Sequence, residues 1–196
     1  MNNNSLSYLR RTNFLLYFII YSFIGWCIET VYLSLSKGHF VSRGFLIGPF
    51  CCIYGFGAVF LIKLLKHFKH NMFLVFTGAS VIATLLEYIA GMLMRLLFNI
   101  VLWDYSHELF NVHGFICLRA SITWGLMSVI ALYFIHPFIR LVVSSVPLSF
   151  KSFMLPILSL CVILNIIVSS VYAWGIGIDL SHLEAISIKL KSMAGF

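Results

Sequence analysis

Residues 44–55 read GFLIGPFCCIYG, and residues 114–125 repeat that outline as GFICLRASITWG. In both copies a Gly-Phe pair begins an apolar segment, and an aromatic residue followed by glycine ends the copy. The spacing of the outer glycines is the same, since 55 − 44 and 125 − 114 are both 11. Each copy follows another apolar segment that contains a glutamate, Glu29 in the first case and Glu87 in the second. The pattern predicts a tandem pair of membrane hairpins.

The composition is typical of a membrane protein. Of 196 residues, 61% are hydrophobic and 10% are charged, whereas soluble domains carry about 25% charged residues. A chain with a mean hydropathy of +1.02 cannot bury its apolar surface in one soluble core of this size. The net charge of +7 does not indicate nucleic acid, because the basic residues lie at the ends of apolar runs, where membrane topology places them. We therefore expect a lipid bilayer, and no nucleic acid, as a partner.

Five apolar runs have about the 20 residues that a helix needs to cross some 30 Å of hydrocarbon. We predict an all-α polytopic membrane protein with about five transmembrane helices, at residues 14–35, 44–65, 72–97, 114–139 and 153–178. Pro137 and Arg140 are expected to end the fourth. The predicted divisions are a cytoplasmic tail (1–13), a membrane core (14–140) made of two hairpin units (14–66 and 72–140), a linker with the fifth helix (141–178), and an extracytoplasmic or interfacial tail (179–196).

The second predicted helix contains Gly48 and Pro49 near its start. Proline is tolerated in the first turn of a helix, because its missing N–H has no partner there. A short re-entrant or broken segment is the alternative, since non-helical backbone is allowed at membrane depth where protein covers it. Gly48, Cys52 and Gly55 form a stripe of small residues that allows two backbones to approach closely.

The distribution of basic residues favours a cytoplasmic N-terminus. With that orientation the cytoplasmic segments contain Arg10, Arg11, Lys63, Lys66, Lys69, Arg140 and Lys151. The opposite side contains Lys37, Arg43, Lys189 and Lys191, with Arg95 and Arg119 near it. The positive-inside rule then predicts a multi-pass protein with five crossings, its N-terminus inside and its C-terminus outside.

The two acids inside apolar runs, Glu29 and Glu87, are the principal candidates for a functional site. A charge at the bilayer centre costs at least about 2.5–3.5 kcal/mol, so such residues are functional candidates by default. We expect them in the outer half of the bundle, with Arg43 and Arg119 pairing with them or holding an anion. One interpretation is an outer-facing polar cavity for a small solute, ion or proton. The alternative is that both acids are neutral or hydrogen-bonded links between helices.

The two hairpin units cross the membrane in the same sense, which predicts parallel repeats related by an axis along the membrane normal. The loops between helices differ in length, because 44 − 29 is 15 and 114 − 87 is 27. Some transporters place their binding site at the interface between repeats, and here that interface would bring the two glutamates close together.

The chain resembles a family known as the "putative ABC-transporter permease" family, type IV or CmpB-like. The first half carries Gly25-Trp26-x-x-Glu29, Arg43-Gly44-x-Leu46-x-Gly48-Pro49 and Ile53-Tyr54-Gly55-x-Gly57. The second half carries Glu87-Tyr88-x-x-Gly91, Trp103-Asp104-Tyr105-Ser106, Asn111, Gly114, Leu118 and Trp124-Gly125. The resemblance covers about residues 14–140. The chain has Cys52 where the family often has proline, and Ser42 where it often has asparagine.

The resemblance implies a plasma-membrane subunit of a transport system, of a family found mainly in Gram-positive bacteria. It adds to the candidate pocket residues, which become Glu29, Glu87, Arg43, Arg119, Trp26, Tyr54, Asp104, Tyr105, Asn111 and Trp124. The expected structural motif residues are Gly44, Gly48, Pro49, Gly55, Gly114 and Gly125.

The chain contains no Gly-x-x-x-x-Gly-Lys-Ser/Thr motif, so an ATPase would have to be a separate subunit. Five helices are few for a complete pathway, which favours a homodimer or a partner subunit. Asp104, His107, Glu108 and His113 match no metallohydrolase spacing, and we expect no metal or cofactor. A membrane-embedded enzyme, with Glu29 or Glu87 as its base, or a non-transporting regulator of the cell envelope is the alternative function.

Overall fold

The computed structural model describes residues 3–42 and 44–174. Its elements are helical, and within those ranges the sole β interaction is an isolated bridge between Val112 and Ile116. The helices are α1 (Asn3–Lys37), α2 (Cys52–Leu65), α3 (Met72–Phe98), α4 (Leu118–Ile130), the π-helical turn η1 (Ala131–Ile135), α5 (His136–Ser145) and α6 (Leu148–Ala173). The predicted all-α fold is confirmed. The tail predicted at 179–196 lies outside the described residues.

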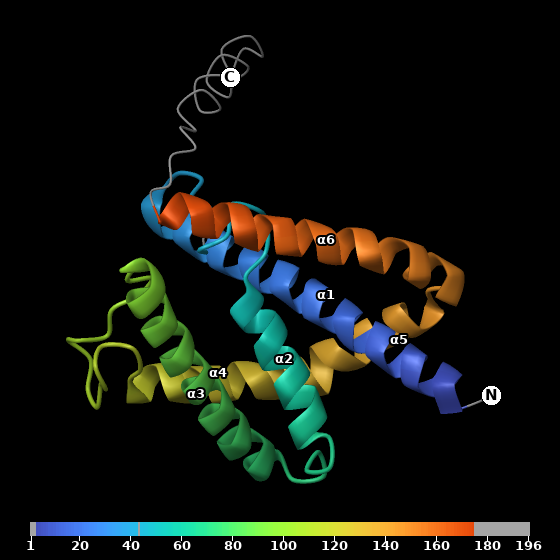
Figure 1. Cartoon of the computed structure of the whole chain (residues 1–196). Helices are drawn as coiled ribbons and strands as arrows, with labels where there is room; N and C mark the ends of the chain where they lie inside the picture. The colour runs from blue at the N-terminus through green and yellow to red at the C-terminus, as the bar shows by residue number, and fades with distance from the viewer. Residues whose placement is uncertain (1–2, 43, 175–196) are drawn as a thin grey trace.

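In the part of the chain that the structure describes, four helical segments are long and apolar enough to cross a membrane: Arg11–Lys37, Met72–Phe98, Leu118–Ser145 and Leu148–Ala173. The fifth apolar helix, α2, has 14 residues, which is about 21 Å at a rise of 1.5 Å per residue. Figure 1 shows α2 between α1 and α3, with α4 alongside α3 and α6 alongside α1. The chain therefore forms two packed groups of helices, α1–α2 with α6 and α3–α4, joined through α2 and through the packing of α5 against α1.

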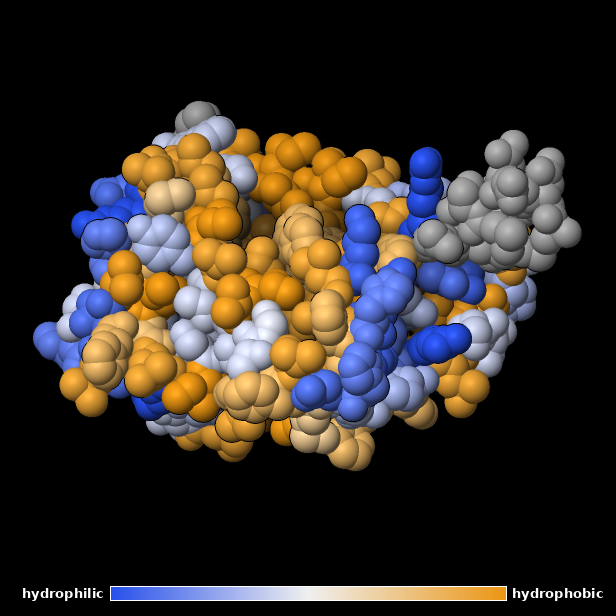
Figure 2. All heavy atoms as spheres, turned by 90° about the horizontal axis from the view of Figure 1, so that it is seen from below, coloured by the Kyte–Doolittle hydropathy of each residue, from blue (hydrophilic) through white to orange (hydrophobic). Residues whose placement is uncertain are grey.

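A hydrophobic core lies where α1, α2, α3, η1 and α5 meet. Its buried residues are Tyr17, Tyr21, Leu61, Ile62, Leu65, Val75, Ala79, Leu132, Ile139 and Val143. Large apolar side chains also cover much of the outer surface, including Leu35, Phe73, Leu96, Phe134 and Phe138. Figure 2 shows one such face, on which hydrophobic residues predominate. In a soluble protein this exposure would promote aggregation, whereas hydrocarbon solvates it without cost.

Several helix boundaries differ from those predicted. The first helix begins at Asn3, so most of the predicted tail is helical. α3 agrees closely with the predicted 72–97, because Asn71 caps its start by accepting hydrogen bonds from the N–H groups of Phe73 and Leu74. α6 begins at Leu148, so only two residues separate it from α5, where a longer linker was expected.

The predicted second helix was wrong in its first third. The residues before α2 are not helical, and the helix begins at Cys52 instead of residue 44. Gly44 has a φ of 109°, a conformation that favours glycine, and Pro49 has no N–H to donate. The non-helical backbone is covered by α6: the N–H of Ile47 donates to Ser169 Oγ (3.0 Å) and that of Gly48 to Asn165 Oδ1 (3.2 Å). This is the broken segment that the sequence left open as an alternative.

The expectation that Pro137 ends the fourth helix was also wrong, since the helix continues to Ser145. The π turn η1 precedes the proline and widens the helix by one residue per turn, which accommodates its missing N–H and its ring. The N–H of His136 bonds to the carbonyl of Ala131 instead of that of Leu132. The freed Leu132 carbonyl accepts a bond from Lys69 Nζ at 3.4 Å.

A cavity with two acids between the helix pairs

Two adjoining cavities of about 510 Å³ and about 150 Å³ lie between the α1–α2 and α3–α4 pairs. The larger one extends to the loops around Gly44 and Trp103, and the smaller one extends toward Tyr21. The residues that line both are Ile53, Tyr54, Leu86, Glu87 and Trp124. The side chains of Tyr54, Glu87 and Trp124 therefore lie where the two spaces meet.

The first acid, Glu29 of α1, lines the larger cavity and is half-buried. The hydroxyl of Tyr54 on α2 donates a hydrogen bond of 2.6 Å to Glu29 Oε1. Tyr54 reaches this position because it lies over Gly25, one helical turn before Glu29, where any Cβ would overlap the tyrosine ring. The pair couples α1 to α2 on the cavity wall.

The second acid, Glu87 of α3, is only 4% exposed and lines both cavities. The hydroxyl of Tyr105 donates a 3.0 Å hydrogen bond to Glu87 Oε1, and the Trp124 side chain also interacts with this carboxyl group. The other oxygen, Oε2, is buried and has no hydrogen-bond partner among the described residues. A buried acceptor without a partner is costly, so Oε2 is the atom that a bound donor or cation would satisfy.

The two acids face a common space. They are close enough to interact electrostatically with one another, and Tyr54 is close enough to interact with both. The rings of Tyr54 and Trp124 meet edge to face, with centroids 5.5 Å apart. The structure thus places Glu29, Glu87, Tyr54 and Trp124 on the wall of one cavity.

Close packing of glycines against serines brings the helices of each pair together. A Cβ on Gly55 would overlap Ser22 of α1, and a Cβ on Gly125 would overlap Ser80 of α3. Ser22 is completely buried. The backbone of α2 thus approaches α1, and that of α4 approaches α3, as small residues permit in membranes.

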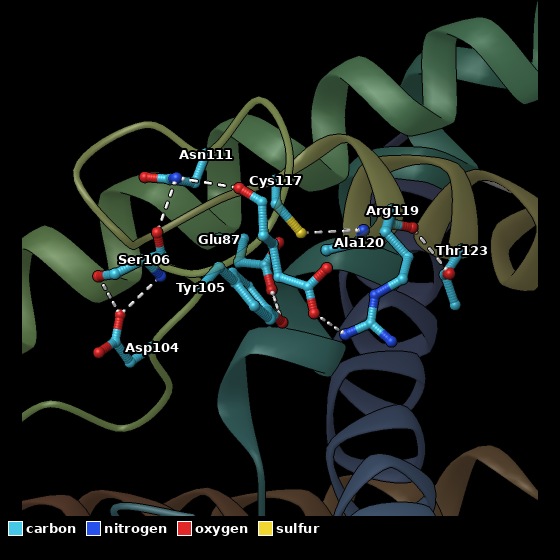
Figure 3. A network of polar contacts seen from close by, with 10 residues as sticks. Glu87, Asp104, Tyr105, Ser106, Asn111, Cys117, Arg119, Ala120 and Thr123 are labelled. Carbon is cyan, nitrogen blue, oxygen red and sulfur yellow. Dashed lines mark hydrogen bonds and ion pairs between the residues drawn. The ribbon is translucent and has the colours of Figure 1, made fainter.

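The loop between α3 and α4 holds Tyr105 in place, as Figure 3 shows. Asp104 accepts two bonds from Ser106, from its N–H at 2.9 Å and its hydroxyl at 2.5 Å, and these lower the pKa of Asp104. The side-chain amide of Asn111 donates to the carbonyls of Ser106 and Glu108, both at 3.0 Å. Burial and the Glu87 charge together raise the pKa of Tyr105, so its hydroxyl stays a donor.

Other predicted pocket residues lie away from the acids. Arg119 pairs with Glu108 at 2.6 Å on the surface, not with Glu29 or Glu87. The indole of Trp26 donates to Ser42 Oγ at 3.3 Å and is not among the cavity lining. Asp104 and Asn111 shape the loop without lining the cavity. Arg43 lies outside the described residues.

The predicted motif glycines have distinct geometric roles. Gly44 and Gly114 have positive φ values of 109° and 72°, so they turn the chain before α2 and α4. A Cβ on Gly48 would overlap Asn165 of α6, which seats residues 47 and 48 against that helix. Residues 44–51 therefore form a wall of the larger cavity that depends on α6.

Sequence reasoning missed most of the cavity wall, which is apolar. Phe45, Leu86, Leu93 and Ile166 line the larger cavity and carry no signal that separates them from lipid-facing residues. Trp103, which was not among the predicted pocket residues, lines the cavity and donates from its indole to the carbonyl of Phe115 at 2.9 Å. No group of three His, Cys, Asp or Glu side chains within residues 3–42 and 44–174 could hold a metal ion.

Comparison with known proteins gives one family. A family model described as "Putative ABC-transporter type IV" matches residues 16–170, which include every described cavity residue. No curated protein and no solved structure matches the chain.

Proposed function

The chain belongs to the family described as putative ABC-transporter type IV, and from that membership we propose that it is the membrane subunit of a transport system that binds a small solute in the cavity between its helix pairs. The observation that carries this proposal is the placement of Glu29 and Glu87 on one cavity of about 510 Å³, with Glu87 Oε2 buried and unpartnered among the described residues. Most buried side-chain oxygens in proteins have a hydrogen-bond partner, so an unpartnered one on a cavity wall favours a ligand over a purely structural link.

The proposal includes a tandem repeat of two helix pairs. Its support is a set of matching contacts in α1–α2 and α3–α4. A serine precedes each acid by the same interval, since 29 − 22 and 87 − 80 are both 7, and each serine lies against the glycine of the Tyr-Gly or Trp-Gly pair. The aromatic residue before that glycine interacts with the acid of its own pair in each case: Tyr54 with Glu29, and Trp124 with Glu87. These equivalences favour parallel repeats with the cavity at their interface.

The proposal also includes five membrane crossings with a cytoplasmic N-terminus. The short basic segment at residues 63–70 then lies on the cytoplasmic side, and the loop at residues 99–117 lies outside. In this orientation the larger cavity faces outward. An ATPase on a separate chain would supply energy, and a second copy or another subunit would complete a translocation pathway.

The decisive experiment compares wild type with Glu29→Gln and Glu87→Gln, each purified in detergent. Glu108→Gln is the matched control, because Glu108 is a loop acid bonded to Arg119 outside the cavity. Small molecules that copurify are extracted and identified by mass spectrometry. We expect one species to be present in wild type and Glu108→Gln and strongly depleted in both cavity variants. Retention of the same species at wild-type levels in folded Glu29→Gln and Glu87→Gln would refute the proposed site.

A further inference from the structure

The larger cavity has a wall that is mostly apolar. Phe45, Leu86, Leu93 and Ile166 are typical of its described lining, in which polar side chains are few. Its volume of about 510 Å³ lies within the range of about 300–1,000 Å³ that is usual for sites of small organic ligands. Ordered water occupies polar hollows, so water alone does not suit this wall. A molecule that matches the wall therefore has a large apolar surface of its own.

The rim of the larger cavity lies on the apolar outer surface of α2 and α3. Phe56 of α2 is 52% exposed, and Ile89, Leu93 and Leu97 of α3 are 46%, 44% and 54% exposed, yet all four line the cavity. The outer faces of both helices carry further exposed apolar side chains. A molecule dissolved in the bilayer can therefore reach the cavity between α2 and α3 without crossing a polar barrier.

One buried oxygen sets the polar requirement of this molecule. Glu87 is 4% exposed and lines both cavities, and its Oε2 has no hydrogen-bond partner among the described residues. An ionised carboxyl oxygen only accepts hydrogen bonds, whereas a protonated one also donates. A hydroxyl group suits both states, because it has one donor and two acceptor lone pairs, while an ammonium group only donates and an ether only accepts. This requirement concerns Glu87 alone.

We propose that the larger cavity binds a hydroxyl-bearing amphiphile from the bilayer, with its hydroxyl group at Glu87 Oε2 and its apolar body between α2 and α3. This inference rests on the proposed function and specifies its substrate class. The molecule enters sideways from lipid, so its concentration in the membrane governs how far the cavity is filled. Trp124 lines both cavities together with Glu87, which places a fluorescent side chain on the wall of the site.

The test uses the fluorescence of the two tryptophans on the cavity wall, Trp103 and Trp124. Replacing the other two, Trp26→Phe and Trp174→Phe, gives a full-length parent protein that reports on the cavity alone. It is reconstituted into phosphatidylcholine vesicles and titrated with ω-bromoundecanol or with bromododecane. These probes have the same number of non-hydrogen atoms and differ by a hydroxyl group in place of a methyl group. Bromine quenches tryptophan on contact, so saturable quenching measures binding at a known probe concentration in the membrane.

We expect ω-bromoundecanol to reach half-saturation at a membrane concentration about tenfold lower than bromododecane does, because a hydrogen bond to a buried carboxyl group is worth about that factor. Glu87→Leu is expected to abolish this preference. Glu108→Gln is the matched control and is expected to keep it, since Glu108 is a loop acid outside the cavity. Both probes meet the same bilayer in every variant, so a difference in their depth cancels from the comparison between variants.

A second variant tests the location of the apolar body without changing the acid. Ala90 of α3 lines the larger cavity, so the ring of Ala90→Phe would occupy the hollow. Leu96→Phe is its control, because Leu96 is 73% exposed on the same helix and is not among the described lining. We expect saturable quenching by both probes to be lost in Ala90→Phe and kept in Leu96→Phe.

Equal half-saturation by the two probes in the parent protein would overturn the inference, and this comparison decides the matter even where Glu87→Leu does not fold. A preference that persists in folded Glu87→Leu, or saturable quenching that persists in folded Ala90→Phe, would overturn it as well. If ω-bromoundecanol shows no preference while a copurified solute still depends on Glu29 and Glu87, the amphiphile inference fails and the proposed cavity stands. If that solute is also independent of the glutamates, both fail.

Discussion

The ring of Tyr54 rests directly on the backbone of Gly25, so that α1 and α2 touch at the point where the tyrosine turns toward its acid. Gly25 and Glu29 are one helical turn apart on the same face of α1. The glycine therefore provides the space, and the glutamate provides the acceptor, for one side chain of the neighbouring helix.

Replacing Gly25 with alanine is expected to displace Tyr54 and weaken its bond to Glu29. The added methyl group would overlap the tyrosine ring, and overpacking of this kind costs about 1–3 kcal/mol. Gly57→Ala is the matched control, because its nearest atom, Leu86 Cδ1, is 3.9 Å from the added carbon. Unfolding followed by circular dichroism in detergent measures both; equal stability of the two variants would contradict the packing.

The Tyr54→Phe variant removes one hydroxyl and leaves the ring in place. We expect a loss of about 1–3 kcal/mol in the free energy of unfolding, because Glu29 Oε1 loses its 2.6 Å bond in a poorly solvated site. Tyr32→Phe serves as the control, since Tyr32 is 71% exposed on the same helix pair. The same unfolding measurement applies, and a Tyr54→Phe protein as stable as Tyr32→Phe would show that the bond contributes nothing.

Alanine at Gly55 and alanine at Gly125 should produce the same defect in the two helix pairs. Each added methyl would overlap a serine of the facing helix, Ser22 in one pair and Ser80 in the other. We expect overpacking to lower the free energy of unfolding of each variant by about 1–3 kcal/mol. The higher helix propensity of alanine relative to glycine offsets up to about 1 kcal/mol of this loss. Thermal unfolding in detergent tests this. A large effect at one glycine and none at the other would count against equivalent pairs.

The pair formed by Arg119 and Glu108 is expected to matter little. Their side chains are 73% and 36% exposed, and such pairs contribute about 0–1 kcal/mol. Arg119→Gln should therefore unfold within about 1 kcal/mol of wild type and retain whatever the cavity binds. Loss of the copurified species in a stable Arg119→Gln protein would show that Arg119 contributes to binding in the cavity.

The orientation of the chain can be tested with two exposed histidines, His39 in the loop after α1 and His67 in the loop after α2. In a background without the five native cysteines, His39→Cys should react with a membrane-impermeant maleimide in intact cells, and His67→Cys only after the membrane is opened. The reverse pattern would invert the proposed topology. Labelling of both in intact cells would mean that α2 does not cross.

Much of the helical architecture was predictable because lipid imposes simple rules on length and hydropathy. α3 agrees with its predicted bounds almost residue for residue, and the structure places Glu29 and Glu87 on one cavity between the α1–α2 and α3–α4 pairs. The start of α2 was not predictable, because it depends on Asn165 and Ser169. These residues lie more than a hundred positions away in the sequence, and their side chains accept hydrogen bonds from backbone N–H groups that a helix would otherwise have satisfied.

The cavity itself was predictable only in its polar part. The acids and their aromatic neighbours carry recognisable signals, since ionisable groups in an apolar run are unusual. Residues such as Leu86 and Ile166 do not, because an aliphatic side chain satisfies a lipid boundary and a binding wall equally well. Arg119 was predicted to lie close to Glu29 and Glu87 because it falls near the outer membrane boundary. In the structure it pairs instead with Glu108 of the neighbouring loop.

The π turn before Pro137 sets the rotational phase of the helix end that follows it. A turn with one residue fewer would rotate α5 by about 100° around its axis, because an α-helix advances 3.6 residues per turn. His136 is 6% exposed, and the centroid of its ring lies 5.0 Å from that of Tyr17. After such a rotation His136, Ile139 and Val143 would no longer face the core. The π turn therefore sets which side of α5 packs into the core.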